Sequence, residues 1–360
     1  MEALITITHV SHPTPDSVTL YFERPDKHFI YYPGQHIAIT ANVNGEVITR
    51  TYSFCTAPFV DKLLAITVKR VAGGTMSAYL VEQAKPGLQL HISEPLGDFF
   101  TMPNACTRRH LVLIAGGSGI TPFYSIARSI LHGESGSMVT LIYANRSWSS
   151  IIFRDQLDQL KRQFGERLRF FYTLDEYEGV PDENVSLIAV KGTLNKLLLK
   201  KLLSAARAAI NLPVEYYICG PFGLMELAMN TLHTMNVPKE NVFMEYFFVP
   251  ETGVSSAIDF GHLSEQTVVV KLYGIDQPLL VPTGQNILEA GLRAGLPLPY
   301  SCRQAQCGTC RSQLVSGQVE LARNHILTND ELARGQVLLC SGYPLSADVV
   351  VRPFTFQDET

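Results

Sequence analysis

The alternation of apolar and polar positions changes character twice along the chain. Residues 1–102 carry short alternating runs separated by Gly and Pro, which predicts an antiparallel, all-β barrel. Between 107 and 250, apolar runs alternate with stretches of helical periodicity, and this order predicts a parallel sheet with helices on both faces. The strands are expected at 110–116, 138–145, 168–174 and 214–220, and the helices at 153–164 and 194–209.

The C-terminal stretch follows a third pattern. Apolar runs at 267–274 and 277–284 predict a strand pair, residues 286–296 have helical spacing, and 347–354 predicts a closing strand. The preceding residues are rich in Pro, Gly and Ser and lack apolar periodicity, which is typical of a linker. We therefore expect a multidomain chain divided into 1–102, 103–250, a linker at 251–266, and 267–360.

Composition excludes several classes of function. The chain of 360 residues is 46% hydrophobic and 17% charged, which leaves ample apolar material for several cores. Its net charge of −4, without a Lys/Arg run, gives no electrostatic footprint for nucleic acid. The uncharged stretch 110–127 is broken by three glycines, so we expect no membrane span. Because the N-terminal residues lack a signal-peptide pattern, we expect a cytoplasmic protein.

Four of the seven cysteines have a spacing that predicts a metal centre. Cys302 and Cys307 have four residues between them, Cys307 and Cys310 have two, and Cys340 follows after 29 more. This is the C-x4-C-x2-C…C spacing of a plant-type [2Fe–2S] cluster, in which one loop supplies three thiolates. A zinc site or plain buried cysteines are the alternatives, but a zinc site usually shows paired C-x2-C knuckles or nearby histidines.

Two glycine turns upstream predict anion sites. The pair at 73–74 ends a β-rich run and precedes a helix that begins near Ser77. The turn at 117–119 follows the strand at 110–116, and the Thr-Pro pair at 121–122 suits the first turn of a helix. Glycines at a helix N-terminus let free N–H groups and the helix dipole face a phosphate.

Taken in order, the motifs of the chain resemble those of the ferredoxin–NADP reductase superfamily. They read R-x-Y-S at 50–53, G-G-x-x-S at 73–77, G-x-G-x-T-P at 117–122, C-G-P at 219–221 and E-x-F at 245–247. Residues 267–360 are similar to a plant-type ferredoxin domain. The whole chain resembles oxygenase reductases with a C-terminal ferredoxin domain, the class that includes the reductases of phenylacetyl-CoA epoxidase and ketosteroid hydroxylase.

The resemblance implies an FAD-binding β-barrel, an α/β domain for NAD(P)H and an α+β ferredoxin domain of β-grasp type. The implied flavin-binding residues are Arg50, Thr51, Tyr52, Ser53, Val68, Lys69, Gly73, Gly74 and Ser77. The implied nucleotide-binding residues are Gly117, Gly119, Thr121, Pro122, Cys219, Gly220 and Pro221. The implied cluster ligands are Cys302, Cys307, Cys310 and Cys340.

The resemblance also implies catalytic positions. Ser53 is expected near the flavin N5, Cys219 beside the nicotinamide C4, and Glu245 with Phe247 near the flavin face. A flavin must stand between a two-electron hydride donor and a one-electron cluster. We therefore expect an NAD(P)H-dependent oxidoreductase that delivers electrons to a protein acceptor, an oxygenase component.

The preferred nicotinamide cofactor is predicted from the residues after the strand at 168–174. Asp175 lies there, and an acid at this place accepts a hydrogen bond from a ribose 2′-OH and repels a 2′-phosphate. This favours NADH over NADPH. The residues that favour the opposite choice, because they suit a phosphate, are Arg146, Ser147, Ser149 and Arg154.

Two other functions stay open at the level of the sequence. One is reduction of a different acceptor, such as a hybrid-cluster protein. The other is a redox sensor without turnover. A sensor has no need for an intact nucleotide domain, so the presence of both the 117–119 and the 219–221 motifs speaks against it.

Overall fold

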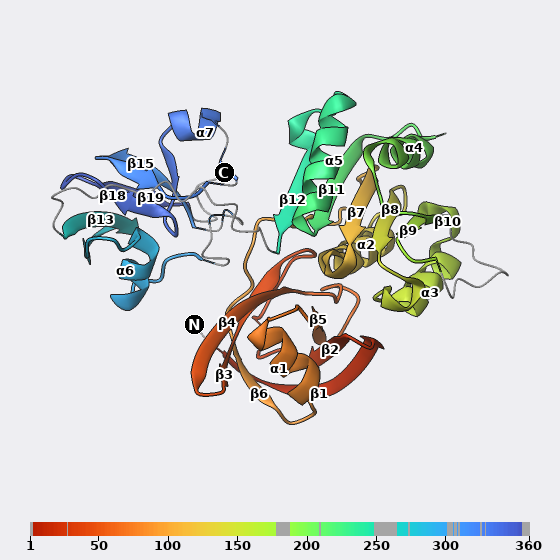
Figure 1. Cartoon of the computed structure of the whole chain (residues 1–360), viewed down its shortest axis with the longest axis horizontal. Coiled ribbons are helices and arrows are strands. Elements are labelled where there is room, and N and C mark those ends of the chain that lie inside the picture. Colours follow the sequence, from red (N-terminus) through yellow and green to blue (C-terminus); the bar gives the residue numbers. More distant parts are fainter. Residues whose placement is uncertain are drawn as a thin grey trace. The chain divides into compact units, whose positions relative to one another are not determined.

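The computed structural model describes residues 3–26, 28–177, 188–208, 210–247, 265–272, 274–300, 305, 308, 310–324, 326–327 and 329–354. The chain divides into two compact units, Met1–Phe248 and Val249–Thr360 (Figure 1). The first unit has two buried apolar clusters and the second has one. Residues 251–264 of the predicted linker lie outside the described residues.

The N-terminal part of the first unit is an antiparallel barrel. Its strands are β1 (Ala3–Thr14), β2 (Ser17–Phe22), β3 (His36–Val43), β4 (Glu46–Ser53), β5 (Leu64–Lys69) and β6 (Gln89–Ile92). They pair in the order β4-β3-β6-β1-β2-β5, and a bridge between Phe54 and Ile66 joins the two outer strands. Helix α1 (Thr75–Gln83) lies over the barrel in Figure 1, and its Met76 and Leu80 belong to the barrel core.

The rest of the first unit is an α/β part built on a parallel sheet. Its strands are β7 (His110–Gly116), β8 (Met138–Asn145), β9 (Leu168–Leu174), β10 (Ile188–Lys191), β11 (Val214–Gly220) and β12 (Val242–Tyr246), in the order β10-β9-β8-β7-β11-β12. The four strands predicted from apolar runs are confirmed at both ends, because strands buried on both faces need an unbroken apolar run.

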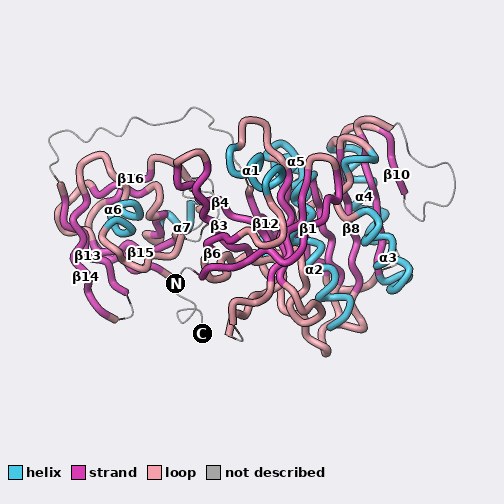
Figure 2. The backbone as a smooth tube through the Cα atoms, turned by 90° about the horizontal axis from the view of Figure 1, so that it is seen from below, coloured by secondary structure: helices cyan, strands magenta, loops and turns pink. Residues whose placement is uncertain are grey.

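Helices cover both faces of this sheet, as predicted. They are α2 (Ile120–Gly133), α3 (Arg154–Phe164), α4 (Lys196–Arg207) and α5 (Phe222–Thr234). Leu111 and Leu113 pack with α2 and α3 in one cluster, whereas the alternating Val112 and Ile114 are buried on the opposite side. Figure 2 shows α4 and α5 on that other side. The short strand β10 was not predicted.

The second unit is an α+β fold with a core of its own. The predicted strand pair is confirmed as the antiparallel strands β13 (Gln266–Leu272) and β14 (Ile275–Val281). The other elements are α6 (Ile287–Arg293), β15 (Arg311–Ser316), β16 (Val319–Leu321), α7 (Asn329–Ala333), β17 (Gln336–Leu338), β18 (Gly342–Pro344) and β19 (Val350–Pro353). The main sheet has the order β14-β13-β19-β15-β17, so the predicted closing strand lies at its centre.

A buried histidine begins the central strand of the α/β part. The side chain of His110 is 0% exposed, and its Nε2 lies 2.8 Å from the hydroxyl of Thr140. Its Nδ1 has no hydrogen-bond partner among the described residues. Burial, reinforced by Arg169 and Arg207, lowers the pKa of His110 from 6.5 to about 4.

This histidine predicts a loss of stability in mild acid. The unfolded chain protonates His110 below pH 6.5, whereas the folded chain does so only near pH 4, so the free energy of unfolding falls as pH drops through that window. At pH 5 the loss should be about 1–2 kcal/mol. Urea unfolding followed by the fluorescence of Trp148, the single tryptophan, measures it.

The variant His110→Gln should remove this part of the pH dependence while keeping a partner for Thr140. The exposed His233 on α5 supplies the matched control, and His233→Gln should retain the wild-type slope. Equal slopes for His110→Gln and the wild type would show that the buried imidazole is not responsible.

Candidate functional site: flavin, nucleotide and cluster positions

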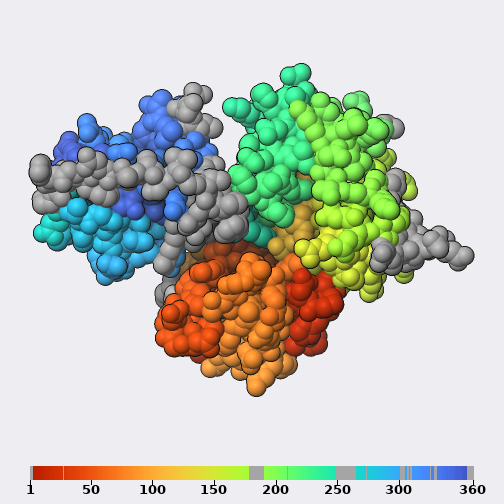
Figure 3. Space-filling model, viewed as in Figure 1, coloured from red at the N-terminus to blue at the C-terminus, as the bar shows by residue number. Residues whose placement is uncertain are grey.

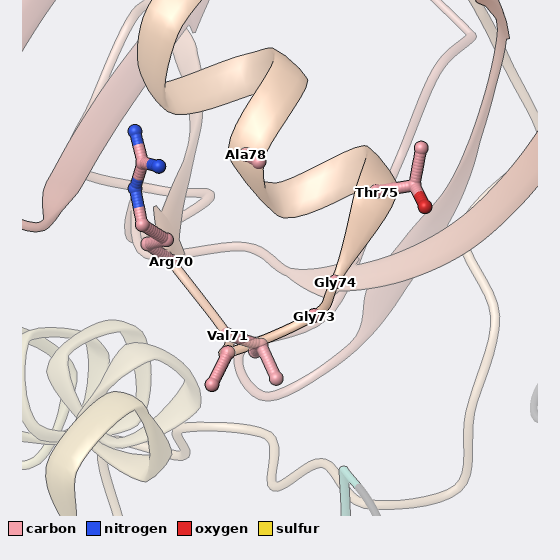
Figure 4. A pocket seen from close by; sticks show the side chains of 7 residues that line it. Arg70, Val71, Gly73, Gly74, Thr75 and Ala78 are labelled. Carbon is pink, nitrogen blue, oxygen red and sulfur yellow. The ribbon is translucent and has the colours of Figure 1, made fainter.

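The Gly73-Gly74 turn forms an open pocket at the N-terminus of α1. The pocket has a volume of about 410 Å³ and lies at the start of the helix, with Arg70 and Thr75 on its two sides (Figure 4). A Cβ at Gly73, whose φ is +72°, would meet no heavy atom within 4 Å among the described residues. Open backbone N–H groups at a helix start suit a pyrophosphate. Arg70, which motif analysis did not predict, lines the pocket while its Nη2 donates to Oε1 of Glu82 at 2.6 Å.

Ser77 uses its hydroxyl inside this turn. Its Oγ accepts a hydrogen bond from the N–H of Val71 at 3.1 Å and donates one to the carbonyl of Gly74 at 3.1 Å. A Cβ at Gly74 would lie 2.6 Å from that Oγ, so this position has no room for a side chain. The serine therefore holds the turn in shape, and its role as a direct ligand stays a prediction.

The other implied flavin residues lie on β4 and β5. Arg50 is exposed and donates a hydrogen bond to the carbonyl of Thr49 at 2.8 Å. Thr51 and Tyr52 are half-buried on the same strand. Val68 belongs to the barrel core, so it offers a ligand only its backbone, and the Nζ of Lys69 lies 3.6 Å from Asp16.

The ends of β7 and β11 touch through glycines. Gly117 begins a 3₁₀ turn with φ +51°, and its outer side is open, which suits a pyrophosphate at the start of α2. On the inner side, a Cβ at Gly119 would lie 2.1 Å from the carbonyl oxygen of Cys219, and one at Gly116 would lie 2.7 Å from Pro221. The two predicted motifs therefore contact each other directly.

The residues after Gly119 complete the start of α2. The hydroxyl of Thr121 donates to the carbonyl of Ser118 at 3.0 Å, and Pro122 is buried in the first helical turn, where no N–H is needed. The hydroxyl of Tyr143 donates to the carbonyl of Gly117 at 2.9 Å. The turn is thus held by one hydroxyl from α2 and one from β8.

A buried carboxylate joins the barrel to the α/β part. Strand pairing places Glu245 beside Cys219. Glu245 accepts a hydrogen bond from the hydroxyl of Ser53 at 3.3 Å through Oε2, and its Oε1 lies 3.1 Å from Nδ1 of His36. All four side chains are less than a tenth exposed. The three predicted catalytic residues are therefore neighbours, and His36 is a member of the group that the motifs missed.

The thiol of Cys219 is not a nucleophile in this setting. Burial raises the pKa of Cys219 well above its usual value, and the carboxylate of Glu245 adds to the effect. A buried cysteine that stays protonated is inert toward covalent catalysis. Gly220 and Pro221 follow Cys219, and Pro221 is the N-cap of α5.

The predicted adenosine end lies at the carboxyl edge of β8 and β9. Asp175 is exposed, and its N–H donates to the carbonyl of Asn145 at 3.2 Å. Ser147 and Ser150 form a capping box, and the guanidinium of Arg154 lies 5.4 Å above the ring of Trp148.

Phe247, which is predicted near the flavin face, follows β12 and is 42% exposed.

Two of the four predicted cluster ligands are described in the second unit. Cys310 and Cys340 are buried, and the N–H of Leu339 donates to the carbonyl of Cys310 at 3.1 Å. The N–H of Ala305, a residue with φ +57°, donates to Sγ of Cys340 at 3.1 Å. Hydrogen bonds from backbone to cysteine sulfur fit an iron–sulfur site. Cys302 and Cys307 lie outside the described residues.

Family models match all three parts of the chain. An oxidoreductase FAD-binding domain matches residues 2–100, an oxidoreductase NAD-binding domain matches 113–230, and a 2Fe-2S iron-sulfur cluster binding domain matches 270–345. The cofactor set predicted from the motifs, FAD, a nicotinamide nucleotide and a [2Fe–2S] cluster, is thereby confirmed. Within the described residues, no helix is long and apolar enough to cross a membrane.

The arrangement defines a flavin- and iron–sulfur-containing oxidoreductase. The chain is 33% identical over 353 residues to one of the subunits of 1,2-phenylacetyl-CoA epoxidase from Escherichia coli, covering 96% of each chain. It is 34% identical over 361 residues to the ferredoxin reductase component of 3-ketosteroid-9-alpha-monooxygenase from Mycobacterium tuberculosis, covering 96% of this chain and 94% of the relative. The chain belongs to the same family as these two proteins.

A solved structure shares the whole fold. Phthalate dioxygenase reductase superposes with a TM-score of 0.55 at 23% identity, and the match covers 98% of both chains. The predicted multidomain architecture is therefore confirmed. The assignment of roles to single residues still rests on the motifs and on the geometry described above.

Because Gly119 contacts Cys219, the addition of one methyl group at position 119 should lower both the stability of the chain and its affinity for NADH. Gly119→Ala should lower the free energy of unfolding by about 1–3 kcal/mol, because the new Cβ meets backbone that has no room to move. The same displacement should raise the Kd for NADH by about tenfold or more, a loss of about 1.4 kcal/mol or more. Urea unfolding and calorimetric titration with NADH measure the two effects.

Gly223 supplies the matched control. It lies in α5, and a Cβ there would meet nothing within 4 Å among the described residues. Gly223→Ala should leave stability within about 1 kcal/mol of the wild type. Wild-type NADH affinity in Gly119→Ala would contradict the assignment of this turn to the nucleotide site.

Proposed function

We propose that the chain is the reductase component of an oxygenase system, which takes electrons from NAD(P)H and passes them through FAD and a [2Fe–2S] cluster to an oxygenase. The observation that carries the proposal is the meeting of Ser53, Cys219 and Glu245. These residues come from a flavin-type barrel and from a nucleotide-type sheet, yet they share one buried place. Relatives that match over nearly the whole chain are oxygenase components, which supports the class of acceptor.

FAD would accept a hydride from the nucleotide, and the cluster would carry electrons onward singly. The protein positions these groups. The start of α1, with Arg50 and Arg70 as cations, would hold the flavin pyrophosphate, and the start of α2 would hold that of the nucleotide. Gly220 has no room for a side chain between Leu224 and Gly116, and a thin backbone there would suit a nicotinamide ring.

Glu245 and Ser53 would take part in proton transfer where the barrel meets the α/β part. The Ser53 hydroxyl donates a hydrogen bond to the carboxylate, so the lone pairs of Ser53 Oγ are directed away from Glu245. His36 holds the second carboxylate oxygen. A carboxylate bound on both oxygens keeps one orientation, which matters because geometry governs proton transfer.

The acceptor proposed for this chain is an oxygenase that acts on a ring compound, of the phenylacetyl-CoA epoxidase or steroid hydroxylase type. NADH is the proposed donor, because Asp175 occupies the edge of β9 where a 2′-phosphate would meet its charge. A cluster carried on cysteine thiolates suits a reducing compartment, so we place this activity in the cytoplasm.

Removing one cluster ligand should separate two activities. Cys340→Ser should lose most of its iron and nearly all NADH-driven reduction of cytochrome c. It should keep NADH-driven reduction of ferricyanide, a small acceptor that reaches the flavin directly. Iron content and the two steady-state rates, taken with the FAD content, measure the separation. A wild-type iron content would rule out Cys340 as a ligand.

The exposed Cys106 supplies the matched control for this variant. Cys106→Ser removes a thiol in the first unit, far from the predicted ligands in sequence, and should leave iron content and both rates unchanged. Loss of iron in both variants would indicate general thiol damage and not a ligand role.

Asp175 should set the choice between nucleotides. The wild type should use NADH with a kcat/KM about tenfold or more above that for NADPH, and Asp175→Ser should narrow the ratio by about tenfold through a gain with NADPH. The neighbouring Glu176→Gln is the control, and it should change the ratio far less. An unchanged ratio in Asp175→Ser would refute the assignment.

A further inference from the structure

The segment after β4 is bound to helix α2 at two points. The hydroxyl of Ser125 donates to the carbonyl of Thr56 at 2.6 Å. Both terminal nitrogens of Arg128 donate to the two carboxylate oxygens of Asp61, with Nη2 to Oδ1 at 2.8 Å. The barrel and the α/β part adjoin in Figure 3, and these contacts cross from one to the other.

Asp61 also fixes the loop that carries it. Its Oδ2 accepts a hydrogen bond from the N–H of Ala57 at 2.8 Å. The side chains of Asp61 and Arg128 are only 22% and 18% exposed, so the pair is shielded from solvent. A bidentate Arg–carboxylate contact fixes orientation as well as distance, which a single hydrogen bond does not.

Aromatic rings support Arg128 from the other side. Its guanidinium lies 5.3 Å from the ring centre of Tyr124. The ring of Tyr124 stacks on Phe153 at 4.5 Å with an interplanar angle of 21°. Phe153 has φ +63°, a conformation that costs a bulky residue energy and persists only where the surroundings impose it.

A second attachment lies at the other end of the same segment. Ser53 is bound to Glu245 of β12, eight residues before Asp61. The two attachments lie at separate places on the α/β part, β12 and α2. Barrel residues also pack in the apolar cluster of the α/β part, namely Cys55, Ala65 and Phe99. Apolar packing is non-directional, so the two polar attachments add the orientation that packing does not fix. The segment from Ser53 to Asp61, which follows the barrel strand with the predicted flavin residues, is thus bound to the α/β part at both of its ends.

We propose that Asp61 and Arg128 form an interdomain positioning pair, which sets the distance and angle between the flavin site of the barrel and the nicotinamide site of the α/β part. This inference rests on the proposed function for its chemical consequence. The hydrogen bonds of the Asp61 and Arg128 side chains go to each other and to Ala57, and none of these three belongs to the predicted flavin or nucleotide motifs. Hydride transfer requires reacting atoms about 3–3.5 Å apart, so a small rotation lowers the rate without preventing binding.

The first test measures geometry in the holoprotein. Spin labels are placed at Val47 on β4 and Leu197 on α4, both more than 60% exposed, in a Cys106→Ser background. The buried Cys55 and Cys219 are shielded from the label. We expect one narrow distance distribution for the wild type. Arg128→Met and Asp61→Asn should broaden or shift it, and an unchanged distribution in both variants would overturn the proposal.

The second test measures the chemical consequence by stopped flow. In Arg128→Met the rate constant for flavin reduction by NADH should fall by about 10- to 100-fold, while the Kd for NADH changes less than about threefold and FAD content stays at the wild-type level. Arg128→Lys keeps the charge without the fork and should give an intermediate rate. An unaltered rate constant in Arg128→Met would also overturn the proposal.

A charge-exchanged variant and a control make the test specific. Asp61→Arg combined with Arg128→Asp restores an ion pair across the same gap but not the hydrogen bond from Ala57, so its distance distribution should be narrower than that of either single variant. Glu166→Gln removes the ion pair between Lys161 and the 90% exposed carboxylate of Glu166, inside the α/β part, and should change neither reading. If the protein bound no FAD, the proposed function would fail, whereas the distance measurement would still decide the role of the pair.

Discussion

Backbone meets backbone where β7 and β11 end, and the rest of the first unit depends on this contact. A side chain at Gly119 would occupy the position of the Cys219 carbonyl. The contact fixes how closely the two strands approach at the carboxyl edge of the sheet, where ligands of α/β folds bind. Strand β12 pairs with β11, so Glu245 takes its place beside Cys219. From there its carboxylate reaches two residues of the barrel, Ser53 and His36.

Elements with strong local signals could be predicted from the sequence. The strands β7, β8, β9 and β11 have apolar runs of seven or eight residues that stop at turn residues. The apolar run that leads into β10 is shorter, at 187–190, and the strand was not predicted from it. Cysteine spacing predicted the class of metal centre, which the matched iron–sulfur domain confirms. The positions of Cys302 and Cys307 lie outside the described residues, so the geometry of the four ligands stays a prediction.

Contacts between distant segments could not be predicted. His36 is a single histidine in a β-rich run, and its partner Glu245 lies 209 residues away. Asp61 and Arg128 are 67 residues apart and belong to no motif. A motif also does not say how a side chain is used. Ser77 matches the expected pattern, yet its hydroxyl is bound within the turn, and Val68 faces the barrel core.

The separate core of the second unit has a consequence for how such a protein can change over time. Its buried cluster is built from residues between Val268 and Val351, and the clusters of the first unit are built from residues between Ile5 and Cys219. Destabilising substitutions at distant, independent sites add without reinforcing each other. Substitutions on the surface of the second unit can therefore change the electron acceptor without destabilising the first unit, in which the residues predicted to bind the nucleotide lie.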